Sequence, residues 1–133
     1  MSNFSDVGDF HRKFDLPVSD EYEGSNPRLL TIDELKFRSK FMREEFNEFM
    51  DAAGHEDLAG MADALVDLVY VAMGTAHMMG LPWETLWSEV QRANMQKERA
   101  VRVEQSKRGS TLDVIKPDGW TPPDIQGCID ACR

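Results

Sequence analysis

Two groups of carboxylates lie near the middle of the chain. Glu44, Glu45 and Glu48 fall within "REEFNEF", and Asp63 and Asp67 fall within "MADALVDLVYVAMGTAHMMG". On α-helices, at about 100° per residue, Glu44 and Glu48 would lie about 40° apart, and so would Asp63 and Asp67. Each group would therefore face one side of its own helix.

These carboxylates predict a site for divalent cations. Acidic side chains gathered in an apolar bundle repel one another unless positive charge balances them. Mg²⁺ and Mn²⁺ prefer such oxygen ligands. The predicted ligands are Glu44, Glu45, Glu48, Asp63 and Asp67.

Two other interpretations of the acidic residues are weaker. The three glutamates alone would fit a solvated helix face, but the apolar neighbours of the two aspartates leave little polar surface there. A di-iron bundle would need Glu-x-x-His pairs, and the residue three after Glu48 is Asp51.

A cluster of basic and amide side chains follows the carboxylates. Cations at a helix C-terminus can simply complement the helix dipole. A basic rim beside a metal site is also what a polyphosphate substrate requires. The predicted phosphate contacts are Asn94, Lys97, Arg99, Lys107 and Arg108.

The elements that position these residues are predicted to be helices. Apolar periodicity and stop signals indicate helices over about 5–14, 31–54, 56–79 and 82–102. Thr31 and Glu34 match a capping box, and Gly80 with Pro82 ends the third helix. No strand alternation is evident. We expect an all-α helical domain over 1–102 and an irregular tail over 103–133 that packs on the site or on a partner subunit.

The third helix is apolar almost all the way round and needs cover on several sides. Four helices of one short chain supply too little cover, which predicts a homo-oligomer, either a dimer or a tetramer. Its two aspartates make it a poor membrane span. The net charge of −9 argues against a nucleic-acid partner, and two cysteines near the C-terminus fit a reduced, cytoplasmic protein.

Three stretches together resemble a known superfamily: "REEFNEF", "MADALVDLVYVAMGTA" and "NMQK". They are similar to the all-α nucleoside triphosphate pyrophosphohydrolases, which include MazG, the dimeric dUTPases and phosphoribosyl-ATP pyrophosphatase. "FHRKFDLP" and "SKRGS…DVIKPDGW" look most like the phage-borne MazG-like, MazZ-type subgroup. The resemblance implies a MazG-like helical bundle completed by oligomerisation.

The superfamily motif is Glu-Glu-x-x-Glu followed by Glu-x-x-Asp. Glu44, Glu45 and Glu48 match the first part, and Asp63 matches the end of the second. Gly60 stands where the motif has its remaining Glu, and Asp67, one turn beyond Asp63, is the natural replacement.

The resemblance implies hydrolysis between the α- and β-phosphates, giving a nucleoside monophosphate and pyrophosphate, with dGTP or GTP as the preferred substrate. Glu45 or Glu44 would be the general base. His11, Phe14 and Trp120 are candidates for base contacts, although each could equally serve packing. Another nucleotide (dUTP, dCTP or phosphoribosyl-ATP) and a catalytically silent helical module remain as alternatives.

Overall fold

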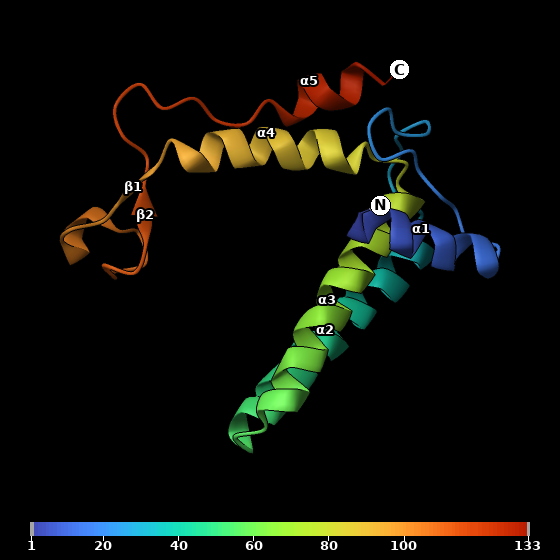
Figure 1. The fold of residues 1–133 in the computed structure, drawn as a ribbon, viewed down its shortest axis with the longest axis horizontal. Coiled ribbons are helices and arrows are strands. Elements are labelled where there is room, and N and C mark those ends of the chain that lie inside the picture. Colours follow the sequence, from blue (N-terminus) through green and yellow to red (C-terminus); the bar gives the residue numbers. More distant parts are fainter. Residues whose placement is uncertain (1, 133) are drawn as a thin grey trace.

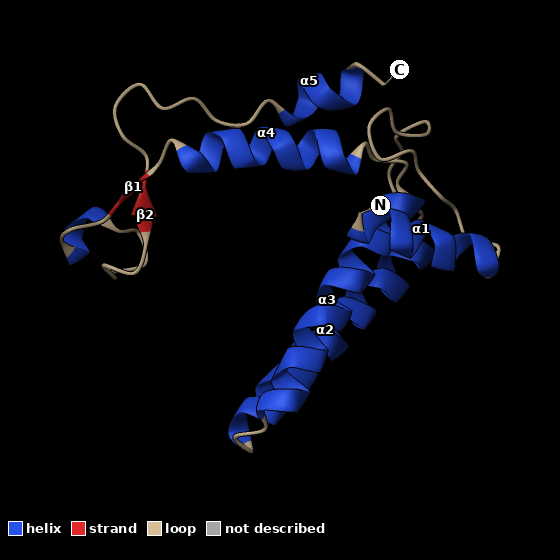
Figure 2. Ribbon diagram, viewed as in Figure 1, coloured by secondary structure: helices blue, strands red, loops and turns tan. Residues whose placement is uncertain are grey.

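The computed structural model describes residues 2–132, and five α-helices dominate it (Figure 2). Met1 and Arg133, the outermost residues of the two predicted segments, lie outside the described part. In chain order the elements are α1 (Asn3–Lys13), α2 (Ile32–Gly54), α3 (Leu58–Met78), α4 (Trp83–Met95), β1 (Glu98–Arg99), the 3-10 helix η1 (Val103–Gln105), β2 (Val114–Ile115) and α5 (Ile125–Asp130).

The helices α2 and α3 form a long antiparallel hairpin, which runs away from the rest of the chain (Figure 1). The predicted capping box begins α2: the Thr31 hydroxyl accepts from the Glu34 N–H at 3.2 Å, and Glu34 accepts from the Thr31 N–H at 2.8 Å. A tight turn with Glu56 at φ 53° joins the helices. Asp57 then caps α3 by accepting from the Gly60 N–H at 3.0 Å. Local sequence signals thus set both ends of this hairpin.

The apolar core lies where α1 crosses the upper end of α3. Phe4 and Val7 of α1 pack on Met73 and Ala76 of α3. The Phe4 ring also stacks on the His77 imidazole, with 3.7 Å between ring centroids. Both nitrogens of His77 are bonded to backbone: the Ser19 N–H donates to Nδ1 at 2.9 Å, and Nε2 lies 2.8 Å from the Phe4 carbonyl.

The chain turns a corner between α3 and α4, and the loop over 15–30 holds that corner. On the α3 side, Gly80 takes φ 68°, and its carbonyl accepts from the Ser25 N–H at 3.0 Å. On the α4 side, the Glu84 N–H donates to the Glu21 carbonyl at 2.8 Å, and the Thr85 hydroxyl donates to the Tyr22 carbonyl at 2.8 Å. One loop therefore fixes the start of α4 relative to the end of α3.

The fourth helix is shorter than predicted and ends at Met95 instead of near residue 102. The Ala93 carbonyl, which would accept from residue 97 in a longer helix, accepts from the Trp120 indole N–H at 2.6 Å. Beyond α4 the chain forms the two-residue strands β1 and β2, paired antiparallel. The prediction of no strand was wrong here, because two residues are too few to show alternation.

The tail over 103–132 is more ordered than predicted. It runs back along α4 and forms α5 beside that helix (Figure 1). The Asp124 N–H donates to Glu89 of α4 at 3.0 Å, and Arg92 donates to the Thr121 hydroxyl at 3.2 Å.

Within a single chain, about half of the apolar side chains of α2 and α3 are exposed. On α2, Leu35 and Phe46 are 56% and 51% exposed, whereas Phe41, Met42 and Phe49 are half-buried. The buried residues of α2 are Arg38 and Glu45. The 21-residue helix α3 is long and apolar enough to cross a membrane by length and composition alone, and only 22% of its most apolar stretch is buried.

Candidate metal centre

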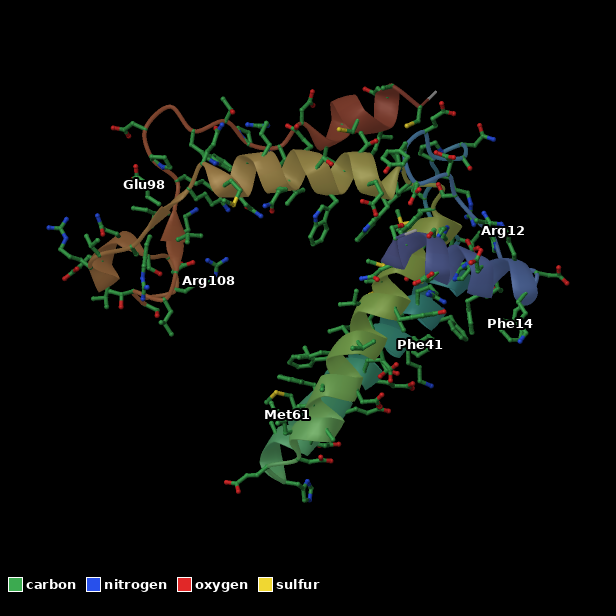
Figure 3. The ribbon with its side chains drawn as sticks, viewed as in Figure 1. Arg12, Phe14, Phe41, Met61, Glu98 and Arg108 are labelled. Atoms are coloured by element: carbon green, nitrogen blue, oxygen red, sulfur yellow. The ribbon has the colours of Figure 1, made fainter. Side chains whose placement is uncertain are left out.

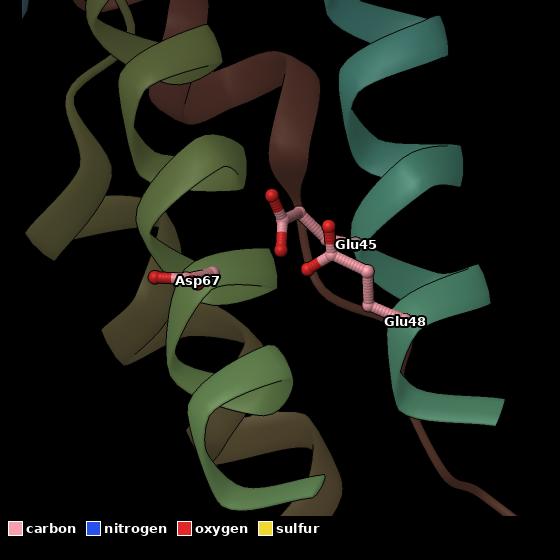
Figure 4. Close-up of side chains that lie close together, drawn as sticks. All are labelled: Glu45, Glu48 and Asp67. Carbon is pink, nitrogen blue, oxygen red and sulfur yellow. The ribbon is translucent and has the colours of Figure 1, made fainter. Parts of the chain in front are cut away.

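Three carboxylates from the hairpin meet at one point between its helices. Glu45 and Glu48 project from α2 toward Asp67 of α3 (Figure 4). One oxygen of each lies within 4.8 Å of the others. Their burial is graded, because Glu45 is buried, Asp67 is half-buried and Glu48 is exposed. We call Glu45, Glu48 and Asp67 the acidic cluster.

The acidic cluster is electrostatically unfavourable on its own. Burial, then contact with Glu48, then the negative charges of Asp67 and Asp63 raise the pKa of Glu45. Burial and the charges of Asp63 and Glu48 raise the pKa of Asp67. Like charges and burial both disfavour the ionised form, so positive charge supplied at this point would be strongly favoured.

One atom in the acidic cluster indicates a missing partner. Among the described residues, the Glu45 Oε2 atom is the buried side-chain oxygen or nitrogen that has no hydrogen-bond partner. A buried carboxylate oxygen without a partner is costly. A hard divalent cation, which binds carboxylate oxygens, would satisfy Oε2 and neutralise its neighbours. The residues present therefore fit a Mg²⁺ or Mn²⁺ site.

The remaining two predicted ligands lie outside this trio. Asp63 is close enough for its charge to act on both Glu45 and Asp67. Glu44 is exposed, its carboxylate is 4.0 Å from the Lys40 ammonium, and it lines a separate surface hollow. Adjacent residues on a helix differ by about 100°, and the rotation of α2 turns Glu45 inward and Glu44 outward.

The predicted phosphate contacts gather at the far end of α4. Lys97, Lys107 and Arg108 line one pocket, together with Lys116. Arg99 lies in β1 and donates to the Thr111 carbonyl at 2.9 Å. Asn94 is in the last turn of α4. The structure thus brings three of these five side chains together, but not beside the acidic cluster.

The predicted base contacts are dispersed. His11 is 2% exposed, and its Nδ1 lies 2.7 Å from the Pro17 carbonyl. Phe14, 53% exposed, packs beside Phe10 at the end of α1 with 4.8 Å between ring centroids. Trp120 is half-buried against α4, and the ammonium groups of Lys97 and Lys116 lie 5.4 and 5.0 Å from its ring centroid.

Residues 7–94 match the family model of phosphoribosyl-ATP pyrophosphohydrolase. The chain belongs to this family. A curated relative, the uncharacterized protein L479 of Acanthamoeba polyphaga mimivirus, is 29% identical over 84 residues, which cover 60% of this chain and 32% of that protein. The chain thus spans about a third of the length of this relative.

The acidic cluster lies within the part of the chain that matches the family model. The matched region contains α2, α3 and all of α4 except Met95, and so every residue of the cluster. A Cβ at Gly60, the position that departs from the superfamily motif, would lie 2.5 Å from the Asp57 carboxylate and 3.1 Å from Ala52 of α2. Gly60 therefore suits the helix cap and the close approach of the two helices, and Asp67 is the α3 carboxylate that lies in the acidic cluster.

Arg38 lies seven residues before Glu45 on the same side of α2 and was not among the predicted site residues. It is 7% exposed, and it donates to the Thr75 hydroxyl at 3.0 Å and to the Val71 carbonyl at 2.9 Å. Burial lowers its pKa. The seven-residue spacing from Glu45, about two helical turns, was the available signal.

Proposed function

We propose that this member of the pyrophosphohydrolase family is a metal-dependent enzyme that cleaves nucleoside triphosphates between the α- and β-phosphates. The products would be a nucleoside monophosphate and pyrophosphate. The observation that carries the proposal is the buried, unpartnered Glu45 Oε2 atom within 4.8 Å of carboxylate oxygens of Glu48 and Asp67.

The acidic cluster would hold two or three Mg²⁺ or Mn²⁺ ions, with Asp63 and Glu44 as further ligands. When bound, these ions would offset the negative charge that develops on the phosphates and make a water molecule a stronger nucleophile. Either Glu45 or Glu44 would accept the proton of the attacking water. Glu45 is already placed at the cluster, whereas Glu44 would have to leave Lys40.

Basic side chains beyond α4 would hold the departing pyrophosphate. Lysine and arginine form charge-assisted hydrogen bonds with phosphate oxygens. Asn94, Lys97, Arg99, Lys107 and Arg108 are the proposed contacts. Trp120, flanked by two lysines, is the proposed base contact that lies nearest these cations, and His11 and Phe14 are the others.

The preferred substrate in this proposal is dGTP or GTP, on the strength of the resemblance to the MazZ-type subgroup. Phosphoribosyl-ATP is the second candidate, because the matching family model carries that description. Both substrates present the same α–β phosphate linkage to the acidic cluster. They differ in the base and in the phosphoribosyl group that phosphoribosyl-ATP carries, whereas the bond to be cleaved is the same.

We also propose that the protein is a homo-oligomer. The apolar side chains of α3 that remain exposed include Leu65, Val66 and Val69, at 49%, 65% and 49%. Burying them would contribute roughly 25 cal/mol for each Å² of apolar surface removed from water. A contiguous apolar face of this kind is typical of a protein interface.

The test is pyrophosphate release with Mg²⁺ or Mn²⁺ from the eight common NTPs and dNTPs and from phosphoribosyl-ATP. We expect release from dGTP and GTP above the others, and loss of release in Glu48→Gln. Asp51→Asn, an exposed carboxylate on the same helix, is the matched control and should retain activity. If another nucleotide gave the most pyrophosphate, that nucleotide would replace dGTP and GTP as the proposed substrate. Absence of release from all of them would refute the enzyme proposal and favour a silent helical module.

A further inference from the structure

The chain carries a second charged feature, separate from the acidic cluster. Residues 96–116 contain six Lys or Arg and three Asp or Glu, a net charge of +3 in a chain of −9. We call this segment the basic arm. It lies beyond the part of the chain that matches the family model, residues 7–94.

The basic arm folds around a pocket of about 560 Å³. Four cationic side chains line it, and they are Lys97, Lys107, Arg108 and Lys116. Arg108 is paired with Asp113 at 2.9 Å, but the three lysines make no ion pair within residues 2–132. Cations held close together without acidic partners attract an anion of several charges, and a triphosphate or pyrophosphate has this character.

Within one chain the basic arm cannot serve the acidic cluster. The arm stands at the far end of α4, well separated from the α2–α3 hairpin (Figure 1), and Arg108 and Glu98 mark it in Figure 3. A swing of α4 would have to break the hydrogen bonds that the Glu84 N–H and the Thr85 hydroxyl donate to the loop over 15–30. The same loop is also bonded to Gly80 at the end of α3, so the corner is braced on both sides.

The corner between α3 and α4 is open and apolar. A groove of about 410 Å³ lies there, lined by Val69, Ala72 and Met73 of α3 and by Trp83 and Trp87 of α4. Trp87 is 58% exposed. The exposed apolar face of the α2–α3 hairpin of a second copy matches this groove in polarity.

The two features complement each other in charge. The basic arm has a net charge of +3, and the acidic cluster gathers three carboxylates. In a two-fold pair the relation is reciprocal, since each copy offers the other the same surface. Both apolar faces would then be covered, and each negative cluster would face a positive arm.

We infer that the basic arm of one copy closes over the acidic cluster of a second copy, and that the arm cations hold the polyphosphate while the other copy's carboxylates serve its reaction. The inference rests on the proposed function for the nature of the anion. The occupant of the α3–α4 corner is thus a second copy of this chain.

A subunit-complementation experiment tests this arrangement. One parent carries Glu48→Gln, and the other carries Lys107→Ala with Lys116→Ala. Each parent alone should have little activity. A heterodimer purified through two different tags has one intact site if the arm acts across copies, so it should recover about half of the wild-type turnover. If the arm acted within its own chain, both sites would be damaged, and recovery would be absent.

A matched heterodimer controls for subunit exchange. Glu48→Gln paired with Lys36→Ala, an exposed lysine of α2, should give about half of the wild-type turnover, since one site stays intact in either arrangement. If the double alanine variant melts differently from the wild type, Lys107→Gln with Lys116→Gln replaces it. No recovery in the test pair with recovery in this control overturns the inference.

A cross-linking experiment reads the same contact without activity. Full-length chains labelled with ¹⁴N and ¹⁵N are mixed and treated with a carbodiimide, which joins lysine amines to carboxylates in contact. We expect peptides of Lys107 or Lys116 joined to the α2 peptide of Glu44, Glu45 and Glu48, with mixed isotopes. Same-isotope pairs only, or no such pair, overturns the inference. An inactive wild type with mixed-isotope pairs would refute the proposed function and leave this arrangement standing.

Discussion

Replacing Glu45 with glutamine should affect stability in opposite directions with and without metal. In the metal-free protein the buried Glu45 carboxylate meets two others, with oxygens within 4.8 Å. Coulomb's law at an effective dielectric constant of 20 gives about 3.5 kcal/mol of repulsion for each ionised pair at that distance. Water at the exposed Glu48 screens much of this. Glu45→Gln should therefore raise the metal-free unfolding free energy by about 1–2 kcal/mol, or roughly 3–8 °C in Tm.

With metal bound, the wild type should have a higher Tm than Glu45→Gln, the reverse of the metal-free order. At a Mn²⁺ concentration of about 100 times Kd, binding would stabilise the wild type by about 2.7 kcal/mol. Glu45→Gln lacks the buried anionic ligand, so its Tm should hardly respond. The assay is thermal unfolding followed by circular dichroism, with and without Mn²⁺, and Asp51→Asn is the control that should behave like the wild type.

Two results would refute this reasoning. A metal-free Tm that falls in Glu45→Gln would mean that the carboxylate already has a partner that compensates its charge. An equal Mn²⁺ shift in the variant and the wild type would mean that the cation binds elsewhere.

Three further predictions concern the surrounding fold. Burial lowers the pKa of His77 from its ordinary 6.5, so only the unfolded state takes up this proton as the pH falls through about 6.5. The stability that neutral His77 contributes should be lost from pH 7 to 5, so the wild type should lose stability relative to His77→Gln over this range in urea unfolding. Trp120→Phe removes the bond to the Ala93 carbonyl and should cost about 1 kcal/mol, with faster hydrogen exchange at the end of α4. Asp57→Ala removes the cap of α3 and should lower the unfolding free energy by about 1 kcal/mol in the same urea assay.

Much of the helical architecture follows from local sequence signals. The capping box at Thr31, the turn near Gly54 and the stop at Gly80 and Pro82 act within a few residues, and the structure confirms the three long helices they delimit to within about two residues at most ends. The end of α4 could not be predicted this way. It depends on Trp120, which reaches the Ala93 carbonyl from 27 positions further along the chain.

The sequence predicted which carboxylates could form the candidate site, but not fully how they are arranged. Spacing placed Glu45 and Glu48 on one side of a helix and Asp67 on the facing one, and the structure brings these three together. Spacing could not choose between Glu44 and Glu45, because the choice depends on how α2 is rotated about its axis. Packing against α3 sets that rotation, and Arg38 takes part by donating to two groups of α3.

The exposed apolar side chains of α2 should make the behaviour of the protein depend on its concentration. Its buried positions hold Arg38 and Glu45, while Leu35 and Phe46 face outward. In the proposed homo-oligomer a neighbouring copy covers this helix, so dilution would expose its apolar side chains again. Specific activity should then rise steeply with enzyme concentration at low copy number and level off once pairs predominate. In a cell, activity would then have a threshold in protein concentration: a slow accumulation of chains would be followed by a sudden onset of activity.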